Sequence, residues 1–138
     1  MTGPAGPAAQ GRPATAVRLG LERHPEGGWY RRTWTSPAVV GDRPAATAIV
    51  FLLTGGEHSA WHRVDADELW LWHGPGELTL QLADAPDAGV AATATLGPEL
   101  VQVLVPAGRW QRTRPASTEV LVSCVVSPGF RWSGFQLG

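Results

Sequence analysis

The chain has 138 residues and a formal net charge of −1, and its 43% share of hydrophobic residues is typical of a globular protein. This length fits one domain with a single core, and the small net charge excludes a strong electrostatic attraction to nucleic acid or to an anionic membrane. The sequence contains no lysine and no asparagine, which excludes Schiff-base lysine chemistry, lysine-containing phosphate loops and N-glycosylation.

The N-terminus predicts no structure of its own. Residues 1–13 consist mainly of Gly, Pro and Ala without periodicity, so we expect a disordered tail followed by one domain over 14–138. No segment resembles a signal peptide or is long enough to span a bilayer, which predicts a cytoplasmic protein. The single cysteine, Cys124, lies in the apolar run EVLVSCVVSP, which predicts a buried thiol rather than a nucleophile.

The first predicted element is a short amphipathic helix. In the run ATAVRLGLER (14–23), Ala14, Val17 and Leu21 recur at helical spacing, and Thr15 is the expected N-cap. The HPEGG segment then breaks the chain, because Pro restricts the residue before it and Gly-Gly permits positive φ.

The rest of the chain predicts strands. Short runs rich in β-formers follow one another at about ten-residue spacing, separated by Gly, Pro and Asp turns, with a loop over 37–44. The predicted strands are 29–36, 46–54, 59–64, 69–73, 77–84, 90–97, 100–106, 109–114 and 119–127. This series favours an all-β sandwich or closed barrel, with helix confined to the N-terminus.

Four motifs resemble the cupin superfamily, and within it the cupin-5 family, also called domain of unknown function 985. In chain order they are HPEGGWYRRT, TAIVFLLTGGEHSAWHRVDADELW, VPAGRWQ and SPGFRWSGFQL. The resemblance covers the chain from about Val17 onward. It implies a double-stranded β-helix, or jelly-roll barrel, that forms homodimers. Its structural kin include sugar-nucleotide keto-epimerases and metal-dependent oxygenases.

The metal signature of the superfamily is incomplete here. At the positions where cupins carry two histidines, a glutamate and a third histidine, this chain has His62, Val64, Glu68 and Gln111. Valine cannot bind a metal, and an amide is a poor ligand for iron or zinc. We therefore expect no cofactor. The alternative is one divalent metal ion bound by His58, His62, Glu68 and Gln111, although an extended strand separates the α-carbons of His58 and His62 by ~13 Å.

The same residues suit acid–base catalysis without a metal. His62 is the predicted base, because an imidazole titrates near neutral pH, and Glu68 is expected to orient it. Tyr30, the only tyrosine, and Glu26, in the Pro-Glu-Gly-Gly turn, are the candidate acids. Gln111 is the expected hydrogen-bond donor. The non-catalytic alternative is that His62 and Glu68 form an inert, hydrogen-bonded pair inside a barrel.

Seven tryptophans are many for this length. Trp70, Trp72 and Trp110 flank the motif positions, so we expect them to line a pocket for a partly apolar or ring-shaped metabolite. Arg32, Arg109 or Arg112 at its rim is expected to bind a carboxylate or phosphate. The sequence thus predicts a cupin barrel that binds a small molecule, as an isomerase-, epimerase- or cyclase-like enzyme. A metal-dependent oxygenase-like cupin and a non-catalytic binder stay open as alternatives.

Overall fold

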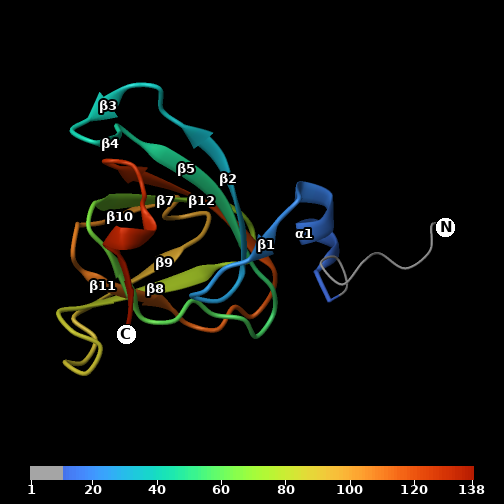
Figure 1. Ribbon diagram of the computed structural model, residues 1–138. Coiled ribbons are helices and arrows are strands. Elements are labelled where there is room, and N and C mark those ends of the chain that lie inside the picture. Colours follow the sequence, from blue (N-terminus) through green and yellow to red (C-terminus); the bar gives the residue numbers. More distant parts are fainter. Residues whose placement is uncertain (1–10) are drawn as a thin grey trace.

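A computed structural model describes residues 11–138, and it shows a barrel of two antiparallel sheets with one helix at its side (Figure 1). The six-stranded sheet has the order β1 (Glu22–Arg23), β2 (Trp29–Thr35), β5 (Thr47–Leu53), β12 (Val120–Ser127), β7 (Asp67–Pro75) and β10 (Gln102–Val105). The five-stranded sheet has the order β13 (Phe135–Leu137), β6 (His62–Val64), β11 (Trp110–Thr113), β8 (Leu78–Ala83) and β9 (Ala92–Leu96). The predicted all-β class is confirmed. The disordered tail predicted over 1–13 falls largely outside the described residues.

The N-terminal helix is present but shorter than predicted. Helix α1 spans Ala14–Leu19, and its N-cap is Pro13 rather than Thr15. Ala16 and the following Leu21 are fully buried against the outer face of the six-stranded sheet, whereas Val17 is 51% exposed. The predicted apolar face was therefore wrong, since Ala16 is buried in place of its neighbour Val17. The reason is that the helix ends before Leu21. No helix within residues 11–138 has the length and apolarity that a membrane span needs.

The predicted loop over 37–44 contains a small two-stranded hairpin. Its strands are β3 (Val39–Val40) and β4 (Arg43–Pro44), and it projects from the top of the barrel in Figure 1. The side chain of Arg43 donates two hydrogen bonds to the Asp65 carboxylate, at 3.1 and 3.0 Å, and others to the carbonyl oxygen of Gly129. The hairpin base is thus joined to the C-terminal segment.

The C-terminal segment forms part of the barrel wall. After a 3₁₀ turn, η1 (Trp132–Gly134), β13 pairs with β6, and the segment, red in Figure 1, crosses the front of the barrel. The backbone N–H of Asp65 donates to the carbonyl of Gly134 at 3.0 Å.

One half of the barrel interior is filled by apolar side chains. Alternate residues of each strand face inward, and the buried cluster is Phe51, Leu53, Trp70, Leu78, Leu80, Leu96, Val105, Ala116, Val120, Val122 and Cys124. Burying a large apolar side chain contributes about 1.5–3 kcal/mol. We call this half of the barrel the closed half, and it fixes the strands that reach into the other half.

Candidate active site

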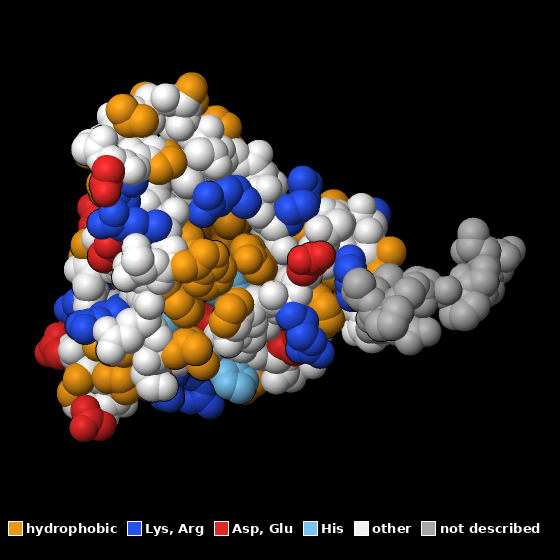
Figure 2. Space-filling model, viewed as in Figure 1, with side chains coloured by type: hydrophobic (Ala, Val, Ile, Leu, Met, Phe, Trp, Pro, Cys, Tyr) orange, Lys and Arg blue, Asp and Glu red, His pale blue; other side chains and the backbone are white. Residues whose placement is uncertain are grey.

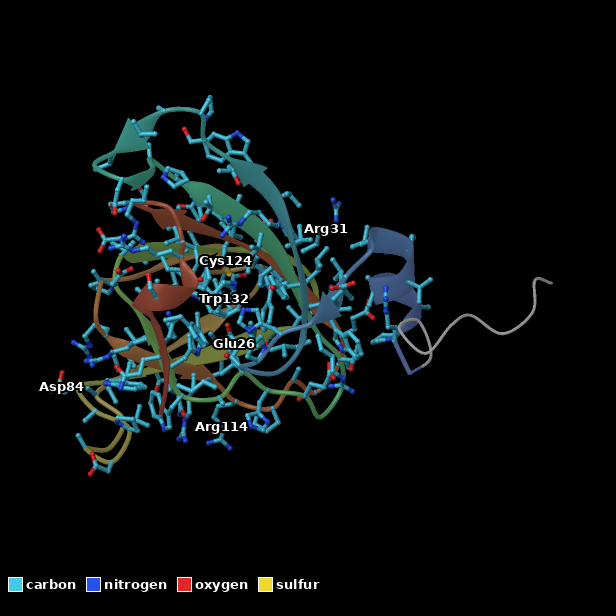
Figure 3. All side chains as sticks on the ribbon, in the orientation of Figure 1. Glu26, Arg31, Asp84, Arg114, Cys124 and Trp132 are labelled. Atoms are coloured by element: carbon cyan, nitrogen blue, oxygen red, sulfur yellow. The ribbon has the colours of Figure 1, made fainter. Side chains whose placement is uncertain are left out.

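The other half of the barrel, which we call the open half, holds a cavity of about 650 Å³. Its lining comes from the β1–β2 segment, from strands of both sheets and from the C-terminal segment: Gly20, Glu22, His24, Glu26, Tyr30, Arg31, Arg32, Thr47, Ile49, His62, Val64, Glu68, Cys124, Val126, Phe130, Arg131, Trp132 and Phe135. In Figure 3, Glu26, Cys124 and Trp132 lie near the middle of the barrel although they come from three separate elements. The volume suits a small metabolite.

His62 and Glu26 form the central contact of the cavity. The Nε2 atom of His62 lies 3.2 Å from Oε2 of Glu26, and both side chains are buried. The other ring nitrogen of His62, Nδ1, lies 2.7 Å from the carbonyl oxygen of Ala60. A carbonyl only accepts hydrogen bonds, so Nδ1 carries the hydrogen. In the neutral ring, Nε2 then keeps a free lone pair that faces Glu26.

Glu26 is fixed by its turn and by two neighbours. The Ser59 hydroxyl, which is fully buried, donates to Oε2 of Glu26. The backbone N–H of Glu26 donates to Nδ1 of His24 at 3.1 Å, and the same nitrogen lies 3.3 Å from Oε1 of Glu26. Gly27 has a φ of 110°, and a Cβ there would collide with the carbonyl oxygen of His58. The turn therefore requires glycine directly after the acid.

Glu68 is held by a second chain of hydrogen bonds. The amide nitrogen of Gln111 donates to Oε1 of Glu68 at 2.7 Å, and the indole N–H of Trp70 donates to Oε1 of Gln111 at 3.0 Å. The Trp70 contact fixes which end of the amide is the donor. Gln111 thus donates to Glu68, whereas its expected role as a donor to a substrate stays a prediction.

Burial moves the pKa of the two buried carboxyl groups and the two buried imidazoles of the cavity toward the uncharged form. Desolvation raises the pKa of Glu26 to about 8, against a smaller opposing effect of the Ser59 hydrogen bond. Desolvation also raises the pKa of Glu68. Burial, together with repulsion from His62, lowers the pKa of His24 to about 3, and burial lowers the pKa of His62 although Glu68 and the Ala60 carbonyl oppose that change. Near neutral pH, Glu26 is therefore protonated and His62 is neutral, and the two meet as a hydrogen-bonded pair.

Cys124 lies at the boundary of the two halves, where it belongs to the apolar cluster and also lines the cavity, but it has no reactive character. Its side chain is 2% exposed, and burial followed by the nearby charge of Glu68 raises the pKa of the thiol. A protonated, buried thiol is a poor nucleophile. This agrees with the reading of Cys124 from the sequence.

Aromatic rings form one wall of the cavity. The His24 ring packs edge-on against Tyr30 at 4.5 Å between centroids, and Trp132 lies 5.7 Å from His24 and 5.3 Å from Phe135. Trp132 is 49% exposed. Figure 2 shows hydrophobic side chains gathered at the centre of this face, with basic side chains bordering them. An apolar surface beside a polar cluster suits a ligand with one flat and one reactive side.

The predicted tryptophan lining is wrong. Trp70 belongs to the closed half, where it packs at 6.0 Å against Phe51. Trp72 is half-buried, and its indole N–H donates to the carbonyl of Gly76 at 2.7 Å. The ring of Trp110 is covered by the guanidinium of Arg63 at 5.0 Å. None of these three tryptophans is among the described residues that line the cavity. For Trp70 the reason is that the inward position next to Glu68 on β7 lies in the packed half.

The other predicted residues divide into two groups. His62, Glu68, Tyr30, Glu26 and Arg32 all line the cavity. Gln111 lies behind Glu68. Glu68 was expected to orient His62. Instead, the carbonyl of Ala60 fixes the imidazole of His62, and Glu26 contacts its other nitrogen.

The side chains do not fit a cupin metal ion. His58 is exposed and lines a separate hollow with Gln81, Arg112, Thr113, Arg114 and Pro115, so the proposed ligand set is divided between two sites. Val64 offers no ligand atom, and the one ligating oxygen of Gln111 accepts from Trp70. Among residues 11–138, no three His, Cys, Asp or Glu side chains are grouped so that they could hold a metal.

Sequence reasoning missed His24, Ser59, Arg131 and Trp132 as parts of the site. The sequence marks His24 only as the residue before a proline, and Ser59 gave no signal. The available signal for Trp132 was the motif SPGFRWSGFQL, whose rings form the cavity wall.

Comparisons with known proteins agree with this architecture. The family model described as cupin superfamily (DUF985) matches residues 14–138. No curated protein matches the chain. Among solved structures, a structural-genomics protein from Shewanella oneidensis is 37% identical, with a TM-score of 0.82 over 90% of this chain and 82% of its own.

Two further structures extend the comparison. A hypothetical protein from Leishmania major is 29% identical, with a TM-score of 0.77 over 92% of this chain and 88% of its own. A cupin 2 conserved barrel domain protein from Rhodopseudomonas palustris is 14% identical, with a TM-score of 0.61 over 85% of this chain and 74% of its own. At that identity the likeness shows the barrel fold alone.

Proposed function

The chain belongs to the DUF985 family of the cupin superfamily, and from that premise we propose that it is an isomerase-, epimerase- or cyclase-like enzyme that moves a proton on a small carbonyl compound. The observation that carries the proposal is the contact of 3.2 Å between Nε2 of His62 and Glu26 inside the cavity. The displaced pKa values favour a protonated Glu26 beside a neutral His62, so one partner can donate a proton and the other can accept one near neutral pH.

The proposed step begins with His62 in its neutral form. A substrate that enters between His62 and Glu26 breaks their hydrogen bond. Nε2 then takes a proton from the carbon beside the substrate carbonyl, while protonated Glu26 gives its proton to the carbonyl oxygen. The pair is then an imidazolium next to a carboxylate, and a proton that passes between them restores the starting state. Tyr30, which also lines the cavity, is the second candidate acid. Glu68, held by Gln111, is a further polar contact for the substrate.

Such a reaction predicts a bell-shaped pH dependence of kcat/KM. His62 must be unprotonated, and its lowered pKa places the acidic limb below 6.5. Glu26 must be protonated, and its pKa of about 8 places the alkaline limb there.

The test is deuterium exchange from heavy water into a panel of small hydroxy-ketones and keto-acids, followed by NMR. We expect exchange that His62→Gln lowers by roughly 10²–10⁴-fold. The matched control is His73→Gln, because His73 is exposed and contacts only the Ser123 hydroxyl among its described hydrogen-bond partners. Equal exchange rates in the wild type and His62→Gln would exclude His62 as the base.

A second candidate is a non-catalytic binder of a small metabolite. One observation favours it: among the described residues, the only fully buried side-chain nitrogen or oxygen without a partner is Nε of Arg109. The polar cluster is thus satisfied without a substrate, as in a structural network. This candidate predicts a ligand that raises the melting temperature and is recovered without deuterium.

We also propose a homodimer located in the cytoplasm. The apolar side chains of Leu100, Val101 and Leu104, at and beside the edge strand β10, are 40–54% exposed, and an uncovered apolar edge favours pairing with another chain. Light scattering of the purified protein measures the mass; a monomer at all concentrations would exclude the dimer.

A further inference from the structure

Three arginines lie among the cavity-lining residues, and they differ in their partners. The guanidinium of Arg131 lies 3.4 Å from Asp42 and 3.7 Å from Asp65, so two carboxylates balance its charge. Arg31 donates to the carbonyl of Leu19 and points away from the barrel in Figure 3. Arg32 donates to the carbonyl of Phe130 at 3.2 Å, and no carboxylate of residues 11–138 lies within ion-pair distance of it.

The carboxyl groups of the cavity do not offset the charge of Arg32. Glu26 and Glu68 are buried in the interior, one bonded to Ser59 and the other to Gln111. Glu22 is exposed and lies opposite Tyr30 in the β1–β2 pair. The cavity thus has an unpaired cation at its mouth, and buried polar groups deeper inside.

The strand geometry relates this cation to the aromatic wall. Arg32 and Tyr30 are two residues apart on β2, so they share one face at a spacing of about 7 Å. Trp132 lies 6.5 Å from the Tyr30 ring, and both lie beside His24. The aromatic wall leads from Arg32 to the reactive pair, because His24, which packs against Tyr30, also lies 3.3 Å from the carboxyl group of Glu26.

We propose that the substrate is a small ring-bearing organic acid whose carboxylate or phosphate is bound by Arg32, with its ring against Trp132 and Tyr30. This inference rests on the proposed function in one respect: it takes the cavity as the site where the substrate binds. A guanidinium binds either anion through charge-assisted hydrogen bonds, and the experiment distinguishes the two.

The probes are benzoate, phenyl phosphate and the uncharged benzamide, titrated by calorimetry into the full chain. A charge-assisted bond worth about 1.5–3 kcal/mol predicts that the preferred anion binds roughly 10–100-fold tighter than benzamide. Tighter binding of benzoate assigns a carboxylate substrate, and tighter binding of phenyl phosphate assigns a phosphate.

The variant Arg32→Gln should remove this preference, and Arg32→Lys should restore part of it because the charge returns. The matched control is Arg114→Gln, because Arg114 is exposed and lines the separate hollow beside His58 rather than the cavity; it should leave the preference unchanged. Equal binding of the three probes, no binding of either anion, or an unchanged preference in Arg32→Gln would each overturn the proposal. His62→Gln should keep the anion preference, so loss of deuterium exchange with intact anion binding contradicts only the proposed function, and the reverse contradicts only this inference.

Discussion

The closed and open halves of the barrel are built by the same strands, but one buries apolar side chains and the other buries ionisable ones. Along β7, Trp70 packs into the closed half, and two residues earlier Glu68 faces the open half. In the closed half, apolar burial stabilises the fold. In the open half, two carboxyl groups and two histidines are buried at a cost that hydrogen bonds offset only in part. The packed half therefore supplies the rigidity that holds the buried polar cluster of the open half in place.

The largest expected effect on stability lies in the closed half. Leu80, which is 1% exposed, belongs to the apolar cluster, so Leu80→Ala should lower the free energy of unfolding by about 2–5 kcal/mol through lost burial and a cavity. Urea denaturation measures it. The control is Leu137→Ala, since Leu137 is 46% exposed, and its cost should be clearly smaller. Similar losses for both would contradict the division into two halves.

In the open half, removing an ionisable group should stabilise the protein at high pH. The folded-state pKa of Glu26 is about 8 against an ordinary value of 4.5, so the folded state keeps a proton that the unfolded state releases, and stability falls as pH rises through that window. Glu26→Gln should be more stable than the wild type by roughly 1–3 kcal/mol at pH 8, and no more stable below pH 4.5. Denaturation at several pH values measures this, with Glu22→Gln, at an exposed position, as the control; a parallel pH dependence of the wild type and Glu26→Gln would contradict the raised pKa.

The boundary between the halves is the hydrogen bond from Trp70 to Gln111. Trp70→Phe keeps most of the ring but leaves Oε1 of Gln111 without its donor, which should cost about 1–2 kcal/mol. A double-mutant cycle with Gln111→Leu should show coupling, because the second change removes the acceptor as well. Additive losses would mean that the amide has no energetic link to the indole.

The fold was largely predictable from the sequence, whereas the site was predictable only in part. Period-two patterns and turn residues indicate strands wherever they occur, so the positions of β2, β5, β8 and β12 followed from local information. His62 and Glu26 were both identified as candidates, but their contact joins residues from two different elements. Strand periodicity gives the face of a residue and not its depth along the barrel, so Trp70 was placed in the cavity instead of the closed half.

The smallest expected effect is at the surface of the open half. Asp42 pairs with Arg131 at 3.4 Å, and both side chains are largely exposed to solvent, at 85% and 43%. Asp42→Asn should therefore change the free energy of unfolding by less than about 0.5 kcal/mol, with added salt making the change smaller still. A large loss, measured in the same urea titrations, would show that the mouth of the cavity contributes to stability as much as the packed half does.

The pairing of β13 with β6 has a consequence for handling the protein. This short strand supplies Phe135 to the cavity wall and pairs with the backbone beside His62. A truncation before Phe135 would remove one wall of the cavity. It would also leave β6 as an edge strand with unpaired backbone groups, and such strands favour aggregation. Purification tags and fusion partners are therefore better placed on the N-terminal side. A tag that displaced β13 would weaken ligand binding in the cavity, and that weakness would not be a property of the native protein.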